Sequence, residues 1–209
     1  PCNDPSHQLR TFVLCGPVLP GHEAEVRAVD GTVLPERHVG AIYVRGPSLM
    51  SGYFRLPKES AEALSPDGWL NTGDLGYMHD GQIVVTGRAK DLIIINGRNI
   101  WPQDLEWSAE NEIDGLRNHD VAVFSIEENQ EEKIVALVHC RPTSPEARAE
   151  LSDRVSSVFR RHGVEATVIL LPPHSLPQTS SGKLTRAKAK AMLLAGAFNR
   201  LDEHAPSAA

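Results

Sequence analysis

The 209-residue sequence has few cysteines and no long apolar stretch, and both scarcities exclude classes of protein. Its three cysteines, Cys2, Cys15 and Cys140, are odd in number and widely spaced. They therefore match neither a disulfide framework nor a zinc site, so we predict no metal ligands and expect a reducing, cytoplasmic compartment. No apolar run is long enough to span a membrane, and the first ten residues lack a signal-peptide pattern.

Positive charge is also scarce. The sequence has 21 Lys and Arg residues and 27 Asp and Glu residues, which gives a formal net charge of −6. Nucleic acids and anionic membranes attract clustered positive charge, so we expect neither as the main partner. The 41% hydrophobic content is sufficient for a folded core. Since the sequence starts with Pro1 and not with Met, we expect it to be part of a longer protein.

Residues 1–89 have the pattern of a β-rich region. Short stretches of β-branched and aromatic residues at 24–29, 41–45 and 82–86 predict strands, and turn sequences rich in Gly, Pro and Asp separate them. Helical periodicity is limited to residues 57–64. This pattern predicts a small barrel-like sheet.

Residues 90–198 have the pattern of a compact α+β domain, and the last residues, 199–209, are predicted to be a disordered tail. The expected elements are a buried strand at 91–95, a helix after residue 102, a hairpin at 121–140, a helix beginning near Pro145, a strand at 167–171 and a helix at 184–196. The predicted buried faces of the three helices are Leu105, Ala109 and Ile113, then Leu151, Val155, Val158 and Phe159, then Leu184, Ala187, Ala191 and Leu194.

The first candidate site residue is Asp74, in the segment WLNTGDLG (69–76), which predicts a tight turn. An ionised carboxylate has two acceptor oxygens and can bind both vicinal hydroxyls of a ribose. An Asp beside a Gly also forms turns through local backbone hydrogen bonds. From this segment alone, the plain turn is the better-supported interpretation.

The segment GRAKDLIIINGRN (87–99) supplies two further candidates, Arg88 and Lys90. Arg88 follows a predicted strand, where its donor groups can reach a ribose or phosphate oxygen. Lys90 lies where the β-rich region ends, so its backbone dihedrals can serve as a hinge. For each residue taken alone, a surface salt bridge or a solvated loop charge is the better-supported interpretation.

The segment LPQTSSGKLTR (176–186) predicts a flexible, hydroxyl-rich loop that carries Lys183 just before the last helix. A mobile ammonium group can hold a carboxylate near a phosphate and offset the charge that develops on phosphoryl oxygens. The alternative is a loop with one exposed lysine. A cation near a helix N-terminus is slightly unfavourable, which favours a functional reason for Lys183.

The order and spacing of TGDLG, GRAKD and PQTSSGK resemble the adenylate-forming superfamily, which includes acyl-CoA synthetases, fatty acyl-AMP ligases, peptide-synthetase adenylation domains and luciferases. The resemblance extends from about residue 15 to residue 198. It implies that residues 1–89 are the end of the large N-terminal domain and that residues 90–198 are the mobile C-terminal lid. The implied reaction joins a carboxylate to ATP, with Mg²⁺ at the phosphates, giving acyl-AMP and pyrophosphate.

The resemblance also implies a role for each candidate residue. Asp74 would bind the ribose hydroxyls, and Arg88 would contact the ribose or phosphate part of ATP. Lys90 is at the hinge position, and Lys183 is at the position of the catalytic lid lysine. The phosphate-binding loop and the acyl pocket of the family do not occur in this sequence, so the chain alone is predicted to be inactive.

Within the superfamily, the segment NGRNIWPQDLE is most similar to fatty acyl-AMP ligases, which implies transfer of the acyl group to the phosphopantetheine of a carrier protein. An acyl-CoA synthetase that uses free CoA remains an alternative. A third possibility is a non-catalytic docking module, in which a stripe of Lys183, Arg186, Lys188 and Lys190 meets an acidic carrier protein. A solvated helix face is the simpler interpretation of that stripe.

Overall fold

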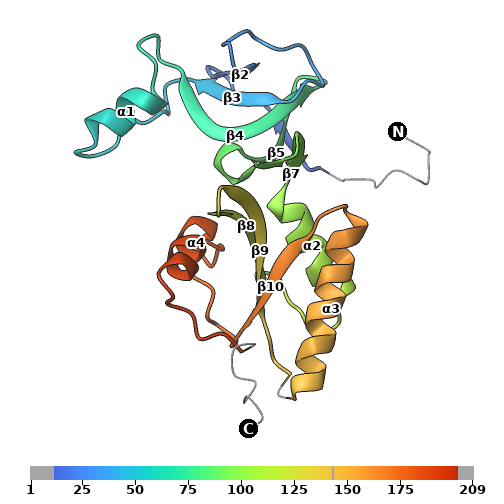
Figure 1. Cartoon of the computed structure of the whole chain (residues 1–209). Helices are drawn as coiled ribbons and strands as arrows, with labels where there is room; N and C mark the ends of the chain where they lie inside the picture. The colour runs from blue at the N-terminus through green and yellow to red at the C-terminus, as the bar shows by residue number, and fades with distance from the viewer. Residues whose placement is uncertain (1–11, 143, 202–209) are drawn as a thin grey trace. The chain divides into compact units, whose positions relative to one another are not determined.

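Two kinds of architecture follow each other along the chain in the computed structural model, which describes residues 12–142 and 144–201 (Figure 1). The boundary between two compact units falls between Lys90 and Asp91. Strands dominate the first unit, and three longer helices accompany a central sheet in the second. The predicted α+β class is confirmed, and each unit is described by itself.

The first unit is built on a five-stranded antiparallel sheet with the order β1-β5-β4-β3-β2. Its strands are β1 (Leu14–Pro17), β2 (Glu23–Arg27), β3 (Gly40–Arg45), β4 (Leu70–His79) and β5 (Gln82–Arg88). Within the described residues β1 and β2 are the two edges and do not pair with each other, so the expected barrel-like sheet is open. Helix α1 (Pro57–Ala63) begins with proline, which suits the first helical position because its missing N–H has no intrahelical partner.

The sequence did not predict β4, because Asn71, Gly73 and Asp74 favour a turn. In the structure, β4 lies between β3 and β5 and pairs with both. Ladder hydrogen bonds on both sides outweigh the local preference of these residues.

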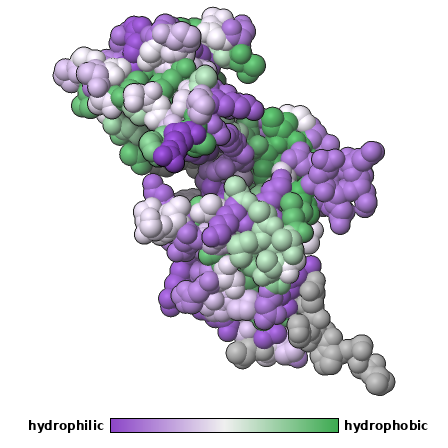
Figure 2. Space-filling model, turned by 90° about the vertical axis from the view of Figure 1, so that its left-hand side faces the viewer, coloured by the Kyte–Doolittle hydropathy of each residue, from purple (hydrophilic) through white to green (hydrophobic). Residues whose placement is uncertain are grey.

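The core of the first unit is small. Val26, Ile42, Trp69 and Val84 are its buried hydrophobic side chains among the described residues. Many other apolar side chains stay exposed, including Phe54 at 84% exposure. Figure 2 shows hydrophobic residues interspersed with hydrophilic ones on the surface of the molecule.

The second unit has a three-stranded sheet of order β10-β9-β8. Its strands are β8 (Val121–Glu128), β9 (Glu131–His139) and β10 (Ala166–Leu171). Asn129 and Gln130 join β8 to β9 and both have positive φ, as a two-residue hairpin turn requires. Strand β10 runs parallel to β9, and the connection between them contains helix α3.

Helices cover both faces of this sheet (Figure 1). The helices are α2 (Pro102–Glu112), α3 (Pro145–Arg161) and α4 (Arg186–Leu194). Alternate strand residues such as Val123 and Ala136 pack with α2 and α3, and their neighbours such as Phe124 and Leu137 pack with α4. Because both faces are buried, the strands read as continuous apolar runs and not as alternating ones.

The predicted buried faces of α2 and α3 are confirmed, since all seven side chains are buried. The hydroxyl oxygen of Ser144 accepts a hydrogen bond from the N–H of Ala147 and caps the start of α3. The predicted face of α4 is only partly confirmed. Leu184 packs against the core just before the helix, but Ala187 is exposed and Leu194 is 64% exposed. Ala189 is the buried residue of the helix, because α4 begins at Arg186 and turns another side toward the sheet.

The predicted buried strand at 91–95 is confirmed only in part. Residues Ala89–Asp91 form the 3₁₀ helix η1, and the strand is limited to β6 (Ile93–Ile95), which pairs only with β7 (Arg98–Ile100) among the described residues. Ile93 is buried but Ile94 is 57% exposed, because a two-stranded ribbon has one free face. The expected loop is therefore a hairpin whose Arg98 donates hydrogen bonds to the carbonyl groups of His162 and Gly163 at the end of α3.

Most of the predicted disordered tail, from residue 202 onward, lies outside the described residues, as does Cys2. The preceding residue, Leu201, donates its N–H to the carbonyl oxygen of Leu170 in β10 and packs against the core.

Candidate active site

Asp74 and Arg88 are brought together on adjacent strands of the first unit. They are register partners in the β4–β5 ladder, and Nε of Arg88 lies 2.9 Å from Oδ1 of Asp74. The Asp74 side chain is 29% exposed and that of Arg88 63% exposed. The pair thus presents a carboxylate and a donor fork at the accessible end of the ladder, the combination that hydrogen-bonds ribose hydroxyls and phosphate oxygens.

Irregularities in the pairing of β4 set the orientation of Asp74. The ladder with β3 shifts between Ala41 and Tyr43, and the ladder with β5 shifts between Leu75 and Gly76. Such bulges re-aim side chains and are common near active sites. Asp74 therefore does not occupy the predicted tight turn between elements, and that expectation is wrong.

Side chains that precede Asp74 fix the bulge. The amide oxygen of Asn71 accepts the N–H of Gly73, and the hydroxyl of Thr72 accepts the N–H of Asp74. Thr72 also donates to the carbonyl oxygen of Ile42 in β3. Because Asn71 and Thr72 make the local turn bonds, the carboxylate of Asp74 is left to Arg88 and to external groups.

Gly76 is required by packing. A Cβ atom at this position would lie 2.1 Å from the carbonyl oxygen of Val84. The second glycine of TGDLG thus lets β4 approach β5 closely beside the Asp74–Arg88 pair.

Lys90 is exposed within η1 and is the last residue of the first unit. This position suits the predicted hinge, because a change in its dihedrals acts between the two units and not inside either one.

Lys183 is exposed on a turn that backbone hydrogen bonds close at several points. The N–H of Thr179 donates to the carbonyl oxygen of Lys183, and the N–H of Lys183 donates to the hydroxyl of Thr179. Gln178 and Leu184 form a β-bridge below the turn, and Gly182 supplies the positive φ of 77°. The loop expected to be flexible is therefore an ordered turn that presents a long side chain.

Arg186 does not belong to the predicted basic stripe. Its side chain is 17% exposed and ion-paired with Glu106 and Asp91, whereas Lys183 and Lys188 are exposed. The sequence reasoning missed this cluster. The available signal was Glu106, a charged residue beside Leu105 on a helix of the predicted core.

Comparisons with known proteins agree with these motifs, although no family model matches the chain. The chain is 58% identical over 194 residues to a putative acyl-CoA synthetase of Caulobacter vibrioides, covering 92% of this chain and 34% of that protein. It is 35% identical to the long-chain-fatty-acid–AMP ligase FadD26 of Mycobacterium marinum, covering 80% of this chain and 31% of the relative. A solved structure from a study of fatty acyl-adenylate ligases of E. coli and L. pneumophila is 46% identical with a TM-score of 0.81, covering 91% of this chain and 34% of that one.

The chain belongs to the adenylate-forming superfamily. It matches the C-terminal portion of these proteins and spans about a third of the length of the relatives.

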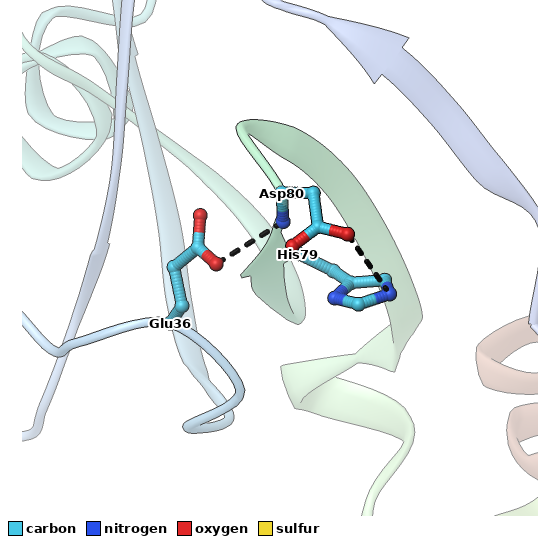
Figure 3. Close-up of side chains that lie close together, drawn as sticks. All are labelled: Glu36, His79 and Asp80. Carbon is cyan, nitrogen blue, oxygen red and sulfur yellow. Dashed lines mark hydrogen bonds and ion pairs between the residues drawn. The ribbon is translucent and has the colours of Figure 1, made fainter. Parts of the chain in front are cut away.

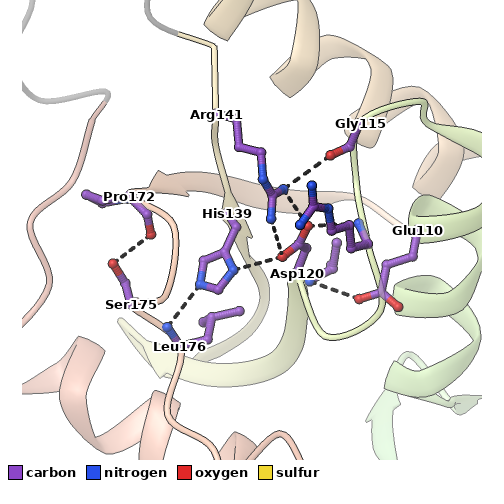
Figure 4. A network of polar contacts seen from close by, with 10 residues as sticks. Glu110, Gly115, Asp120, His139, Arg141, Pro172, Ser175 and Leu176 are labelled. Carbon is purple, nitrogen blue, oxygen red and sulfur yellow. Dashed lines mark hydrogen bonds and ion pairs between the residues drawn. The ribbon is translucent and has the colours of Figure 1, made fainter.

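In this superfamily member, a buried polar network holds the segment that leads to the Lys183 turn (Figure 4). Nδ1 of His139 lies 3.0 Å from Oδ1 of Asp120, and Nε2 of His139 accepts the N–H of Leu176 at 3.1 Å. In this arrangement Nε2 of His139 is the acceptor for the backbone of Leu176, and Nδ1 faces the carboxylate of Asp120. Arg141 donates to both oxygens of Asp120.

The pKa of Asp120 is lowered although burial acts to raise it, because hydrogen bonds from Arg141 and His139 favour the carboxylate. Strand β9 thus anchors the beginning of the segment that carries Lys183.

A second cluster in the first unit places Glu36, His79 and Asp80 with potential ligand atoms within 4.8 Å of one another (Figure 3). One oxygen of Glu36 accepts the N–H of Asp80 and the other accepts the N–H of Gly81. These hydrogen bonds lower the pKa of Glu36, that from Gly81 most. Because both oxygens already close the β4–β5 turn, we assign this cluster a structural role and keep the prediction of no metal ligands.

None of the helices in the part of the chain that the structure describes is both long enough and apolar enough to cross a lipid bilayer.

Proposed function

We propose that this chain is the C-terminal part of a ligase that activates a fatty carboxylic acid with ATP. A carboxylate oxygen of the acid attacks the α-phosphorus, an acyl-AMP anhydride forms, and the bond to pyrophosphate breaks. The activated acyl group then passes to the phosphopantetheine thiol of an acyl carrier protein, in the cytoplasm. The observation that carries this proposal is the ion pair of Asp74 and Arg88 on adjacent strands, in a chain whose ordered turn also presents Lys183.

Each of these residues has a distinct role in the proposal. The Asp74 carboxylate accepts hydrogen bonds from the ribose hydroxyls, and the Arg88 guanidinium donates to the ribose or phosphate oxygens. Lys183 places a positive charge beside the substrate carboxylate and the phosphoryl oxygens, where negative charge develops. Mg²⁺ neutralises the phosphates when bound, and the Lys90 hinge carries the lysine to and from the nucleotide.

The names of the relatives support both the proposed acceptor and its alternative. The Mycobacterium marinum relative is a fatty-acid–AMP ligase, whereas the Caulobacter relative is named a putative acyl-CoA synthetase. An acyl-CoA synthetase that uses free CoA is therefore the second candidate.

The deciding experiment uses the full-length protein that contains this chain. It is supplied with ATP, Mg²⁺ and a fatty acid, together with either CoA or a holo carrier protein, while pyrophosphate and thioester products are measured. We expect pyrophosphate and the carrier thioester. Formation of acyl-CoA instead would establish the second candidate, and no pyrophosphate with any carboxylic acid would exclude both. The 209-residue chain alone is expected to release no pyrophosphate, since it has no phosphate loop.

A further inference from the structure

Arg186 connects two acidic residues that are far from it in sequence. Its Nε lies 2.7 Å from Oε1 of Glu106, its Nη2 donates to Oε2 of the same carboxylate, and its Nη1 lies 2.8 Å from Oδ2 of Asp91. The side chains are only 17%, 8% and 24% exposed for Arg186, Glu106 and Asp91. A guanidinium fork is one of the few groups that can hold two carboxylates at once in fixed directions.

Glu106 ties this cluster to the rigid core of the second unit. Its Oε1 also accepts the N–H of Val123 in β8 at 2.8 Å, and Glu106 is a buried residue of α2. The buried carboxylate of Glu106 thus has hydrogen bonds both from Arg186 and from the backbone of β8. Loss of either partner would leave a buried charge without one of its hydrogen bonds, which is costly. Arg186 is therefore attached to the sheet and helix core and not to a mobile surface.

Only Leu184 and Thr185 separate Arg186 from Lys183, and backbone contacts with residues 177 and 178 fix both of them. Leu184 is in the β-bridge with Gln178, and the N–H of Thr185 donates to the carbonyl oxygen of Pro177. The Lys183 turn and the start of α4 thus form one continuous hydrogen-bonded piece.

Asp91 is the first residue of the second unit and directly follows the predicted hinge residue Lys90. The ion pair with Arg186 fixes Asp91 to the piece that carries Lys183.

We propose that Arg186 is a positioning residue that couples the Lys90 hinge to the Lys183 turn through Asp91 and Glu106, so that hinge rotation and lysine placement occur as one rigid-body movement. This inference rests on the proposed function only for its effect on adenylation. The coupling itself is a property of this chain.

The coupling is tested on the 209-residue chain by hydrogen–deuterium exchange of residues 89–92 and 177–185. We expect Arg186→Lys, which lacks the planar guanidinium fork that holds both carboxylates in fixed directions, to raise the exchange of both segments about 10-fold. The matched control is Glu128→Ala, which breaks the exposed ion pair with Lys133 in the same unit and should change neither segment. Faster exchange in one segment alone would overturn the coupling, whatever the activity of the protein.

The effect on the reaction is tested with Asp91→Ala in the full-length protein, because this variant keeps the Arg186–Glu106 pair and with it the fold. We expect kcat for pyrophosphate release to fall about 10-fold, within the range typical of coupling between sites, with KM for ATP unchanged. Asp91→Glu should restore part of the rate, and Glu128→Ala should have no effect. A lower melting temperature with unchanged kcat would show a merely structural role and overturn the proposal.

A double variant, Asp91→Ala with Arg186→Lys, identifies the route of the effect. If Asp91 acts through Arg186, the double variant loses no more rate than the more affected single variant. Multiplying losses would contradict the proposed route. Absence of pyrophosphate release in the unmodified protein would instead contradict the proposed function, and the exchange experiment would still decide the coupling.

Discussion

The two units hold their candidate functional residues by different means. In the first unit, Asp74 and Arg88 lie within a β-ladder, and strand pairing together with bulges fixes their relative position. In the second, Lys183 lies on a turn outside the sheet, and hydrogen bonds to residues distant in sequence anchor both ends of its segment. For the proposed roles, a ladder suits a pair that binds the nucleotide in a fixed geometry, and an anchored turn suits a charge that moves as one body.

The units also differ in how much apolar surface they bury. The second unit covers both faces of its sheet, whereas the first leaves Val29, Phe54 and other large apolar side chains exposed. Exposed apolar surface of this extent is typical of interaction sites. We therefore expect the second unit to be the more stable of the two by itself, and the first to depend on further contacts.

The largest expected effect concerns the moving charge. In the full-length protein, Lys183→Ala should lower the rate of acyl-AMP formation by about 100- to 1000-fold, because the developing phosphoryl charge loses its counter-charge. Transfer from supplied acyl-AMP to the thiol should remain largely intact. Single-turnover measurements of the two steps check this, with Lys188→Ala as the control on the same segment. Equal loss of both steps would contradict the role given to Lys183.

The next prediction tests the difference in core packing. Phe159→Ala in α3 should cost about 3–5 kcal/mol of unfolding free energy, because it leaves a cavity in the larger core. Val84→Ala in β5 should cost less, since it removes fewer buried atoms from a smaller core. Urea unfolding, followed by hydrogen exchange of each unit separately, measures both. A larger loss for Val84→Ala would break the comparison.

A smaller effect is expected for the binding pair. Asp74→Ala should raise KM for ATP about 10-fold or more, because charge-assisted hydrogen bonds to the ribose contribute about 1.5–3 kcal/mol. The effect on kcat should be smaller. Asp80→Asn, also in the first unit but in the turn after β4, is the control and should leave KM unchanged. The KM of the unmodified protein for deoxyribose ATP gives a second measure of the same contact. A KM as high as that of Asp74→Ala for ATP would support the contact between Asp74 and the ribose hydroxyls. Equal KM values of the unmodified protein for ATP and deoxyribose ATP would contradict it.

The smallest effect concerns Glu110 in α2. Burial raises its pKa to about 7, although the N–H of Val121 donates to it. Because the folded state holds this proton more tightly than the unfolded state, stability falls as pH rises from about 4.5 to 7. Glu110→Gln should remove this fall and add about 1 kcal/mol of stability at pH 8, an amount reduced by solvent screening. Chemical denaturation at pH 5 and pH 8 measures the unfolding free energies of the unmodified protein and of Glu110→Gln. If the two proteins differed by the same amount at both pH values, the role given to Glu110 would be contradicted.

Sequence reasoning was accurate where one local pattern dominates. The helical period of Leu151, Val155 and Phe159 predicted the buried face of α3, and apolar runs bounded by turn residues predicted β8 and β9. It failed where tertiary contacts compete with local preference. Strand β4 contains turn-forming residues but is paired on both sides, and the apolar residues after Asp91 form a short hairpin with β7 in which Ile93 is buried and Ile94 is exposed.

The sequence alone determined the superfamily, the α+β class and the identity of the four candidate residues, because short motifs and apolar periods are local properties of the chain. Only the tertiary structure decided how these residues are held. It paired Asp74 with Arg88, ordered the turn that carries Lys183, and turned Arg186 away from a basic surface into a buried contact with Glu106 and Asp91. Pairing across a sheet and ion pairs over 80 or more residues depend on the whole fold, which no local pattern encodes.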